Sequence, residues 1–133
     1  MWNRYKGNKY GNRKIQFDGQ TFDSKKEMRH YTELLLLEKA GNIKDLQRQV
    51  KFQLIPAQRE PDTIGPKGGH KPGKLIEREL DYIADFVYTD VSTGQMVVED
   101  IKGYKATNAP AYSKFAIKRK LMLYMLGIRV KEV

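Results

Sequence analysis

Two aspartates and a lysine lie inside apolar runs of sequence that are typical of β-strands. The run 82–88 contains Asp85, and the run 97–103 contains Asp100 and Lys102. Both runs are rich in β-branched and aromatic residues, and a short Gly-containing turn separates them, so they predict an antiparallel hairpin. If the turn is centred between the runs, Asp85 lies opposite Asp100.

Carboxylates in that position need a neutralising partner. Opposed residues of an antiparallel pair have Cβ atoms about 5 Å apart, and like charges there repel. A divalent cation such as Mg²⁺, which prefers oxygen ligands, would relieve the repulsion between Asp85 and Asp100. Lys102 would then lie over the same site and could hold or activate an attacking water, or stabilise charge at phosphorus. The alternative is structural: an ion pair between Asp85 and Lys102, with Asp100 hydrogen-bonded nearby.

Regular alternation of side chains assigns the faces of the first strand. It places Asp85 and Val87 on one face, and Tyr82, Ala84 and Phe86 on the other.

The composition indicates one basic domain. The chain has 133 residues, 25 Lys and Arg against 16 Asp and Glu, a net charge of +9 and a pI near 9.7. This charge favours a polyanionic partner such as nucleic acid, although an anionic membrane surface could also use it. No stretch is apolar enough to span a bilayer, and the start of the chain lacks the apolar core of a signal peptide, so we expect an intracellular, cytoplasmic protein.

Several catalytic classes are excluded by the residue types. The absence of Cys removes thiolate nucleophiles, disulfides and Cys-ligated zinc. His30 and His70 fall in different predicted elements, which leaves little support for a His-based metal site or a Ser-His-Asp triad. We interpret His30 as a surface or packing residue of a helix.

The N-terminal segment 1–14 is predicted to be a flexible arm. It carries five Lys or Arg residues and no acid, with aromatic residues interleaved. Cations and stacking rings suit nucleic acid, and a solvated tail is the alternative. A single domain is predicted to follow over 15–133.

The order of predicted elements within that domain is helix, three strands, helix, strand. A small hairpin at 15–22 precedes a helix at 25–40, which begins with a capping box from Ser24 to Glu27. The remaining elements are a strand at 46–54, the strand pair at 82–103, a helix at 111–126 and a strand at 128–133. A flexible loop is predicted at about 56–73, where Pro and Gly concentrate, and it could close over a ligand.

The second helix and its flanks are basic. Lys105, Lys114 and Lys118 precede a nearly acid-free end of the chain. Lys114 and Lys118 share one helix face. Contact with phosphates is favoured over a merely solvated face.

This element order, with an acid late in the second core strand and Asp-x-Lys in the third, resembles the PD-(D/E)XK nuclease superfamily. The first acid of that pattern corresponds to Asp85, here preceded by Ala84 where the motif has proline. The second acid and the lysine correspond to Asp100 and Lys102, because Glu99 would break the spacing. The resemblance implies an α/β (α+β) restriction-endonuclease-like fold, with an αβββαβ core and a mixed sheet flanked by helices.

Further segments of the sequence indicate which family within this superfamily the chain resembles. The chain is similar to a family of small phage-encoded nucleases, which are in turn similar to archaeal-type Holliday junction resolvases and TnsA-like transposon endonucleases. The segments that carry this likeness are 22–27, 40–49, 82–86, 98–103 and 112–120.

The resemblance implies a Mg²⁺-dependent endodeoxyribonuclease, in which Mn²⁺ could substitute. Asp85, Asp100 and the carbonyl of Ile101 would hold the metal, and Lys102 would position and activate the nucleophile. Glu27 would bind a second metal or orient a water, unless it serves only the helix cap.

DNA backbone contacts are assigned by the same resemblance. Gln49 would face the scissile phosphate, or is a plain exposed glutamine. The cations that would neutralise the DNA backbone are Lys25, Lys26, Lys105, Lys114 and Lys118.

The leading hypothesis is therefore a homodimeric endonuclease that cuts branched DNA, as a Holliday junction resolvase does, in the cytoplasm of the host cell if it is phage-encoded. The homodimer follows from the two symmetric cuts that a four-way junction requires. The alternatives are a non-catalytic nucleic-acid-binding module and a transposase-like endonuclease subunit.

Overall fold

A four-stranded mixed sheet with a helix on each side forms the body of the protein in the computed structural model, which describes residues 14–102 and 109–133. The strand order is β10-β9-β8-β3; β9 is antiparallel to β8 and parallel to β10, and β3 is antiparallel to β8. The elements in chain order are α1 (Lys25–Lys39), β3 (Ile43–Ile55), β8 (Leu80–Asp90), β9 (Met96–Asp100), α2 (Pro110–Leu126) and β10 (Val130–Glu132). This confirms the predicted αβββαβ order of an α/β (α+β) fold and the mixed sheet flanked by helices. Most of the predicted N-terminal arm, as well as Lys105, lies outside the described residues.

The local signals at the start of the domain produce the predicted elements. β1 (Ile15–Phe17) pairs with β2 (Gln20–Phe22) across a two-residue turn whose Asp18 and Gly19 have φ of 52° and 70°. Positive φ at both positions is typical of the tight hairpin turn that Asp-Gly favours. Ser24 then caps α1 by accepting a hydrogen bond from the backbone N–H of Glu27 at 3.1 Å.

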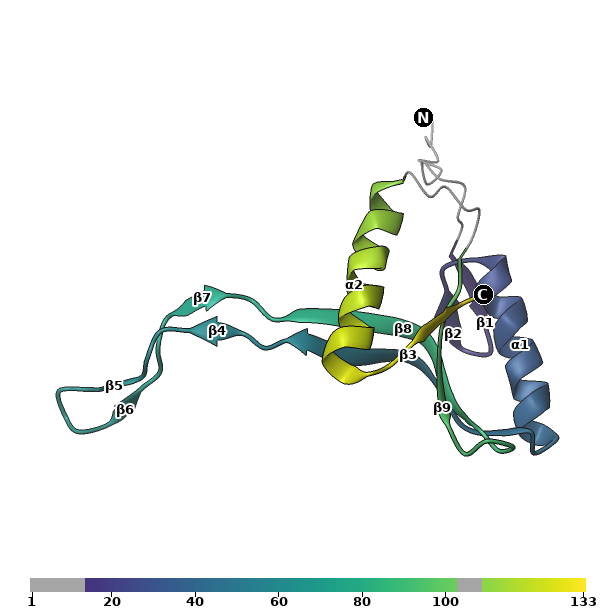
Figure 1. Cartoon of the computed structure of the whole chain (residues 1–133), viewed down its shortest axis with the longest axis horizontal. Coiled ribbons are helices and arrows are strands. Elements are labelled where there is room, and N and C mark those ends of the chain that lie inside the picture. Colours follow the sequence, from purple (N-terminus) through teal and green to yellow (C-terminus); the bar gives the residue numbers. More distant parts are fainter. Residues whose placement is uncertain (1–13, 103–108) are drawn as a thin grey trace, which may run out of the picture.

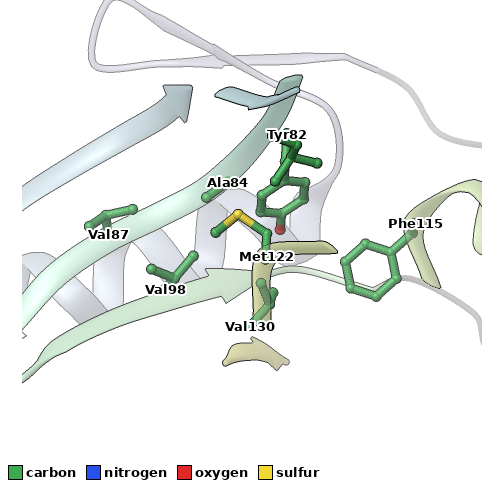
Figure 2. Packing of buried hydrophobic residues seen from close by; sticks show 8 residues of the cluster. Tyr82, Ala84, Val87, Val98, Phe115, Met122 and Val130 are labelled. Carbon is green, nitrogen blue, oxygen red and sulfur yellow. The ribbon is translucent and has the colours of Figure 1, made fainter. Parts of the chain in front are cut away.

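Two separate apolar clusters occupy the two faces of the sheet. The cluster under α2 is drawn in Figure 2 and joins sheet residues to the helix; it contains Leu54, Tyr82, Ala84, Val87, Val98, Phe115, Met122 and Val130. The cluster under α1 contains Phe22, Tyr31, Leu34, Ile43, Phe86 and Tyr88. Figure 1 shows the two helices on opposite sides of the strands.

The predicted alternation along β8 is wrong, because the strand changes faces at Asp85. Tyr82 and Ala84 pack under α2, whereas Phe86 and Tyr88 pack under α1. The neighbouring strand does the same, since Leu46 packs with the α1 cluster while its Val50, Phe52 and Leu54 pack with the α2 cluster.

The change coincides with a backbone irregularity in β3. Gln49 has φ of 52°, and the printed pairing of β3 with β8 passes from Arg48↔Phe86 to Val50↔Ala84. A left-handed residue interrupts the pleat, so residues two apart no longer share a face. One strand pair can thereby supply apolar residues to both helices.

The segment 56–73, predicted as a long flexible loop, instead contains short paired strands. β4 (Gln58–Arg59) pairs with β7 (Leu75–Glu77), and β5 (Thr63–Ile64) pairs with β6 (His70–Lys71). The sequence did not predict this pairing, because Pro and Gly are typical of loops. Because β3 and β8 are antiparallel neighbours, the chain that joins them must return on itself, and Figure 1 shows it as a ribbon extending away from the helices.

Neither helix in the described part of the chain is long and apolar enough to cross a membrane.

Met122 is expected to be essential to the α2 cluster. It is fully buried, while the next residue, Leu123, is half exposed. Met122→Ala should lower the free energy of unfolding by about 2–5 kcal/mol because it leaves a cavity. Leu123→Ala, a matched control on the same helix turn, should cost less than about 1 kcal/mol. Urea denaturation measures both, and equal losses would contradict this packing.

Candidate active site

The hairpin of β8 and β9 brings the two predicted aspartates to neighbouring positions. Its pairs run from Thr89↔Met96 to Phe86↔Glu99, which is the predicted register. Asp85 and Asp100 are the next residue on each strand. The backbone N–H of Ile101 donates a hydrogen bond to Asp85 Oδ2 at 2.7 Å, which fixes the Asp85 carboxylate against the end of β9.

The carboxyl group of Asp85 holds its proton more tightly than an ordinary aspartate does. Burial, together with repulsion from Asp100 and Glu27, raises the pKa of Asp85 to about 7, against the lowering effect of hydrogen bonds from Ile101 and Gln49. Burial destabilises the ionised form of a carboxyl group relative to the protonated form. The negative charge of Asp85 is therefore poorly compensated near neutral pH, which is typical of functional sites.

Gln49 joins two of the acidic side chains. Its Nε2 donates to Glu27 Oε1 at 3.2 Å and to Asp85 Oδ1 at 3.3 Å. The left-handed backbone at Gln49 is the irregularity at which β3 and β8 change faces. Non-Gly residues held in this region cost free energy and are common at active sites. The Gln49 side chain thus spans Glu27 and Asp85, and its contact with a phosphate stays a prediction.

Glu27 has only 3% of its surface exposed and does not close the capping box with Ser24. One carboxylate oxygen accepts from the backbone N–H of Asp23 at 3.2 Å. The other accepts from Arg48 Nη2 and Gln49 Nε2, both at 3.2 Å. The carboxylate of Glu27 thus points from α1 toward β3 and the neighbourhood of Asp85.

Asp100 and Lys102 form a close ion pair. Lys102 Nζ is 2.7 Å from Asp100 Oδ1 and lies 3.2 Å from the centre of the Phe115 ring. The hydroxyl of Tyr82 donates to Asp100 Oδ2 at 2.6 Å, and burial raises the pKa of Tyr82 far above its usual range, so this donor stays protonated. The structural alternative considered above paired Lys102 with Asp85; the structure pairs it with Asp100.

The donor set suits a hard cation in its chemistry. Asp85, Asp100, Glu27 and the carbonyl of Ile101 offer only oxygen, as Mg²⁺ prefers. Within residues 14–102 and 109–133, however, no three His, Cys, Asp or Glu side chains are grouped so as to hold a metal ion. Asp100 is instead satisfied by Lys102 and Tyr82.

Two of the predicted DNA-binding lysines lie beside this ion pair. Lys114 and Lys118 of α2 line an open pocket of about 310 Å³ together with Asp81, Asp100 and Lys102. The helix face predicted from their spacing therefore opens toward the candidate site.

The other predicted DNA-binding lysines behave differently. Lys26 Nζ donates to the backbone carbonyls of Lys102 and Val133, so it ties α1 to the ends of β9 and β10. Lys25 is exposed. Lys105 is not among the described residues.

Arg48 was not predicted as a site residue. Its guanidinium stacks over the Phe22 ring at 3.8 Å and bonds to Gln20 Oε1 at 2.7 Å as well as to Glu27. The signal was present in the sequence, since Arg48 is the one exception to the apolar even positions of 46–54. A cation at an inward position predicts a buried acidic partner.

A second buried carboxylate lies on the α1 side of the sheet. Glu99 is 1% exposed and contacts His30 Nε2 at 2.8 Å. Because His30 is one helical turn beyond Glu27, this contact holds the part of α1 that carries Glu27 against β9. His30 is thus the packing residue predicted, and it also bonds to Glu99.

Backbone strain at Gln49 can be measured by substitution. Gly adopts positive φ freely, whereas Ala does not, and both remove the amide that bridges Glu27 and Asp85. Gln49→Gly should therefore be more stable than Gln49→Ala by about 1 kcal/mol. Chemical denaturation of the two variants measures the difference. A more stable Ala variant would show that residue 49 does not have this backbone conformation.

Comparison with curated proteins and with solved structures gave no match. A family model described as a protein of unknown function, DUF1064, matches residues 7–129. Because that match spans nearly the whole sequence, the chain belongs to the DUF1064 family.

Proposed function

We propose that the protein is a Mg²⁺-dependent endonuclease that hydrolyses phosphodiester bonds in branched DNA. The observation that carries the proposal is the Asp85 carboxylate, held near Asp100 and Glu27 with a pKa of about 7. Lys102 lies beside the same group of acids. Three carboxylates and one ammonium arranged in this way match the group that the PD-(D/E)XK resemblance implies, as does the αβββαβ order.

The metal would be held by Asp85, Asp100 and the carbonyl of Ile101. When bound, Mg²⁺ would neutralise the aspartates and polarise the scissile phosphate. Asp85 must lose its proton to act as a ligand, so uptake of the cation is favoured as pH rises above about 7.

Lys102 is suited to act on the phosphate or on the attacking water. Its ammonium is fixed by Asp100 and by the face of Phe115, which limits its freedom. A cation held in advance stabilises charge that develops at phosphorus without a reorganisation cost. Glu27, oriented by Arg48 and Gln49, would bind a second metal ion or orient the water.

Lys114 and Lys118 would hold the DNA backbone next to the cut. They share a pocket with Asp100 and Lys102 and belong to a helix that carries no acid. Lysine contacts with phosphate give affinity without sequence preference. A preference for branched DNA and a homodimer that makes two symmetric cuts complete the proposal, and both depend on the resemblance.

A non-catalytic nucleic-acid-binding module is the second candidate. It is favoured by the bonds of Asp100, whose two oxygens are satisfied by Lys102 and Tyr82. In that case the acids and Lys102 brace the sheet, and the lysines of α2 bind DNA.

Cleavage assays separate the two candidates. The wild-type protein with Mg²⁺ should cut a labelled four-way junction faster than a flap, a duplex or a single strand. Asp100→Asn and Lys102→Ala should each lower the cutting rate about 10³-fold or more, because the first removes a metal ligand and the second removes the cation that acts on the phosphate or the water, while junction binding persists.

Asp45→Asn and Lys44→Ala, at exposed positions near the other end of β3, are the matched controls and should cut normally. Equal rates on all four substrates would remove the preference for branches. If no substrate is cut, the endonuclease proposal fails and the nucleic-acid-binding module is the candidate that is kept.

Asp85 should make the folded state less stable as the pH rises. Its pKa is about 7 in the folded protein and near 3.8 when unfolded, so the folded state binds the extra proton in this window. Stability contributed by that proton is complete below about pH 4 and is lost as pH rises through 7.

Asp85→Asn keeps an oxygen for the Ile101 N–H but carries no charge. Its Tm in EDTA should therefore equal that of the wild type near pH 4 and exceed it by several degrees at pH 8. Thermal melts followed by circular dichroism test this, with Asp45→Asn as a control. If the Tm difference between Asp85→Asn and the wild type does not grow with pH, Asp85 does not carry a destabilising buried charge.

A further inference from the structure

The chain between β3 and β8 forms a continuous hydrogen-bonded ribbon, defined here as residues 56–79. The backbone N–H of Glu60 donates to the carbonyl of Lys74 at 2.8 Å, beyond the β4–β7 pair. The β5–β6 pair follows, and the N–H of Gly65 donates to the carbonyl of Gly69 at 2.7 Å to close the tip. Figure 1 shows this ribbon extending well away from α1 and α2.

The ribbon has no apolar core of its own. Every residue of 56–79 is exposed except Gly65 and Gly73. Ile64, for example, has 81% of its surface exposed. A two-stranded ribbon without a packed face is only marginally stable in water.

Specific polar contacts nevertheless define the shape of the ribbon. Asp62 accepts from the backbone N–H of Gly73 and contacts His70 Nε2, both at 2.7 Å. A Cβ at Gly73 would lie 1.7 Å from the carbonyl oxygen of Glu60, so the two sides of the ribbon approach each other at a position where only Gly fits. A segment built in this way, and without a core, is suited to contact a partner.

Charge is distributed unevenly along the ribbon. The tip, defined as residues 63–76, carries Lys67, Lys71 and Lys74 and no acid. The acids of the ribbon flank the tip on the side nearer the body; they are Glu60, Asp62, Glu77 and Glu79. The remainder of the tip is rich in Gly and Pro, which keeps it narrow.

We propose that this tip binds in a groove of a DNA duplex at a distance from the phosphate that is cut. The inference rests on the proposed function, because that function supplies DNA as the partner. The major groove is about 12 Å wide and admits a two-stranded ribbon, and lysines at its edges meet phosphates.

The length of the ribbon places this contact far from Asp85. The chain from Asp85 to Gly68 spans about 55 Å if fully extended, at about 3.3 Å per residue. One turn of DNA is about 34–36 Å long. A ribbon of up to this length can reach a duplex segment about one turn away, or a second branch of a junction.

The test compares two double variants of the full chain with equal net charge. Lys67→Ala with Lys71→Ala removes two cations of the tip. Lys39→Ala with Lys44→Ala removes two exposed cations from the end of α1 and the start of β3. Fluorescence anisotropy in EDTA gives the Kd for a labelled four-way junction over a series of salt concentrations.

The tip pair should weaken binding about tenfold and flatten the plot of log K against log salt by about 2, since each phosphate contact contributes about 0.9. The control pair should change the Kd less than about twofold. Equal losses in the two pairs would overturn the proposal. Unchanged DNA binding with an altered oligomeric state in sedimentation would also overturn it and assign the ribbon to a second copy of the chain.

The outcomes distinguish this inference from the proposed function. If the wild type cuts DNA with Mg²⁺ and the tip pair binds as the wild type does, the ribbon inference alone fails. If the tip pair binds more weakly but the wild type does not cut, the endonuclease proposal alone fails. If the wild type does not bind the junction, both fail.

Discussion

Burial of the Asp85 carboxyl group, close to two other acids, governs the electrostatics of the candidate site. The pairing of β8 with β9 fixes Asp85 next to the end of β9, and the hydrogen bond from the Ile101 N–H prevents its carboxylate from turning away. Glu27 comes from α1 and is anchored by Arg48. Because hydrogen bonds hold each acid in place, the cost of burying this charge is relieved by a proton on Asp85, and the proposed Mg²⁺ would relieve it instead when bound.

The change of faces at Gln49 and Asp85 makes this arrangement possible. In a strand pair with unbroken alternation, one helix would pack on an apolar face of the strands and the other helix would meet a polar face. The left-handed residue in β3 lets β3 and β8 serve the α1 cluster at one end and the α2 cluster at the other. Glu27 and Asp85 then meet at this change of faces, between α1, which supplies Glu27, and α2, which supplies Lys114 and Lys118.

Much of this architecture could be predicted from local patterns. The Asp-Gly turn, the cap at Ser24 and the register of β8 with β9 each depend on a few adjacent residues, and the structure has all three. The change of faces could not be predicted, because period-two alternation assumes an unbroken pleat, and nothing about Gln49 as a residue type favours positive φ.

The remaining differences have similar causes. The strand pairing in the ribbon was not predicted because the segment is rich in Pro and Gly, which have low β propensity. The pairing follows instead from the antiparallel strands β3 and β8 that the ribbon joins. The bond between Glu99 and His30 links positions far apart in sequence, so only the packing of α1 on β9 reveals it. The metal, the nuclease activity and the DNA partner remain predictions.

The position of Gln49 within β3 sets different tolerances to insertion along one strand pair. An extra residue between Gln49 and Val50 would turn Val50, Phe52 and Leu54 out of the α2 cluster, because a shift of one residue exchanges the faces of a strand. An extra residue beyond Gly73, toward the tip, would leave that cluster and the acids untouched. The reach of the ribbon can therefore diverge among related chains while the spacing around Gln49 cannot.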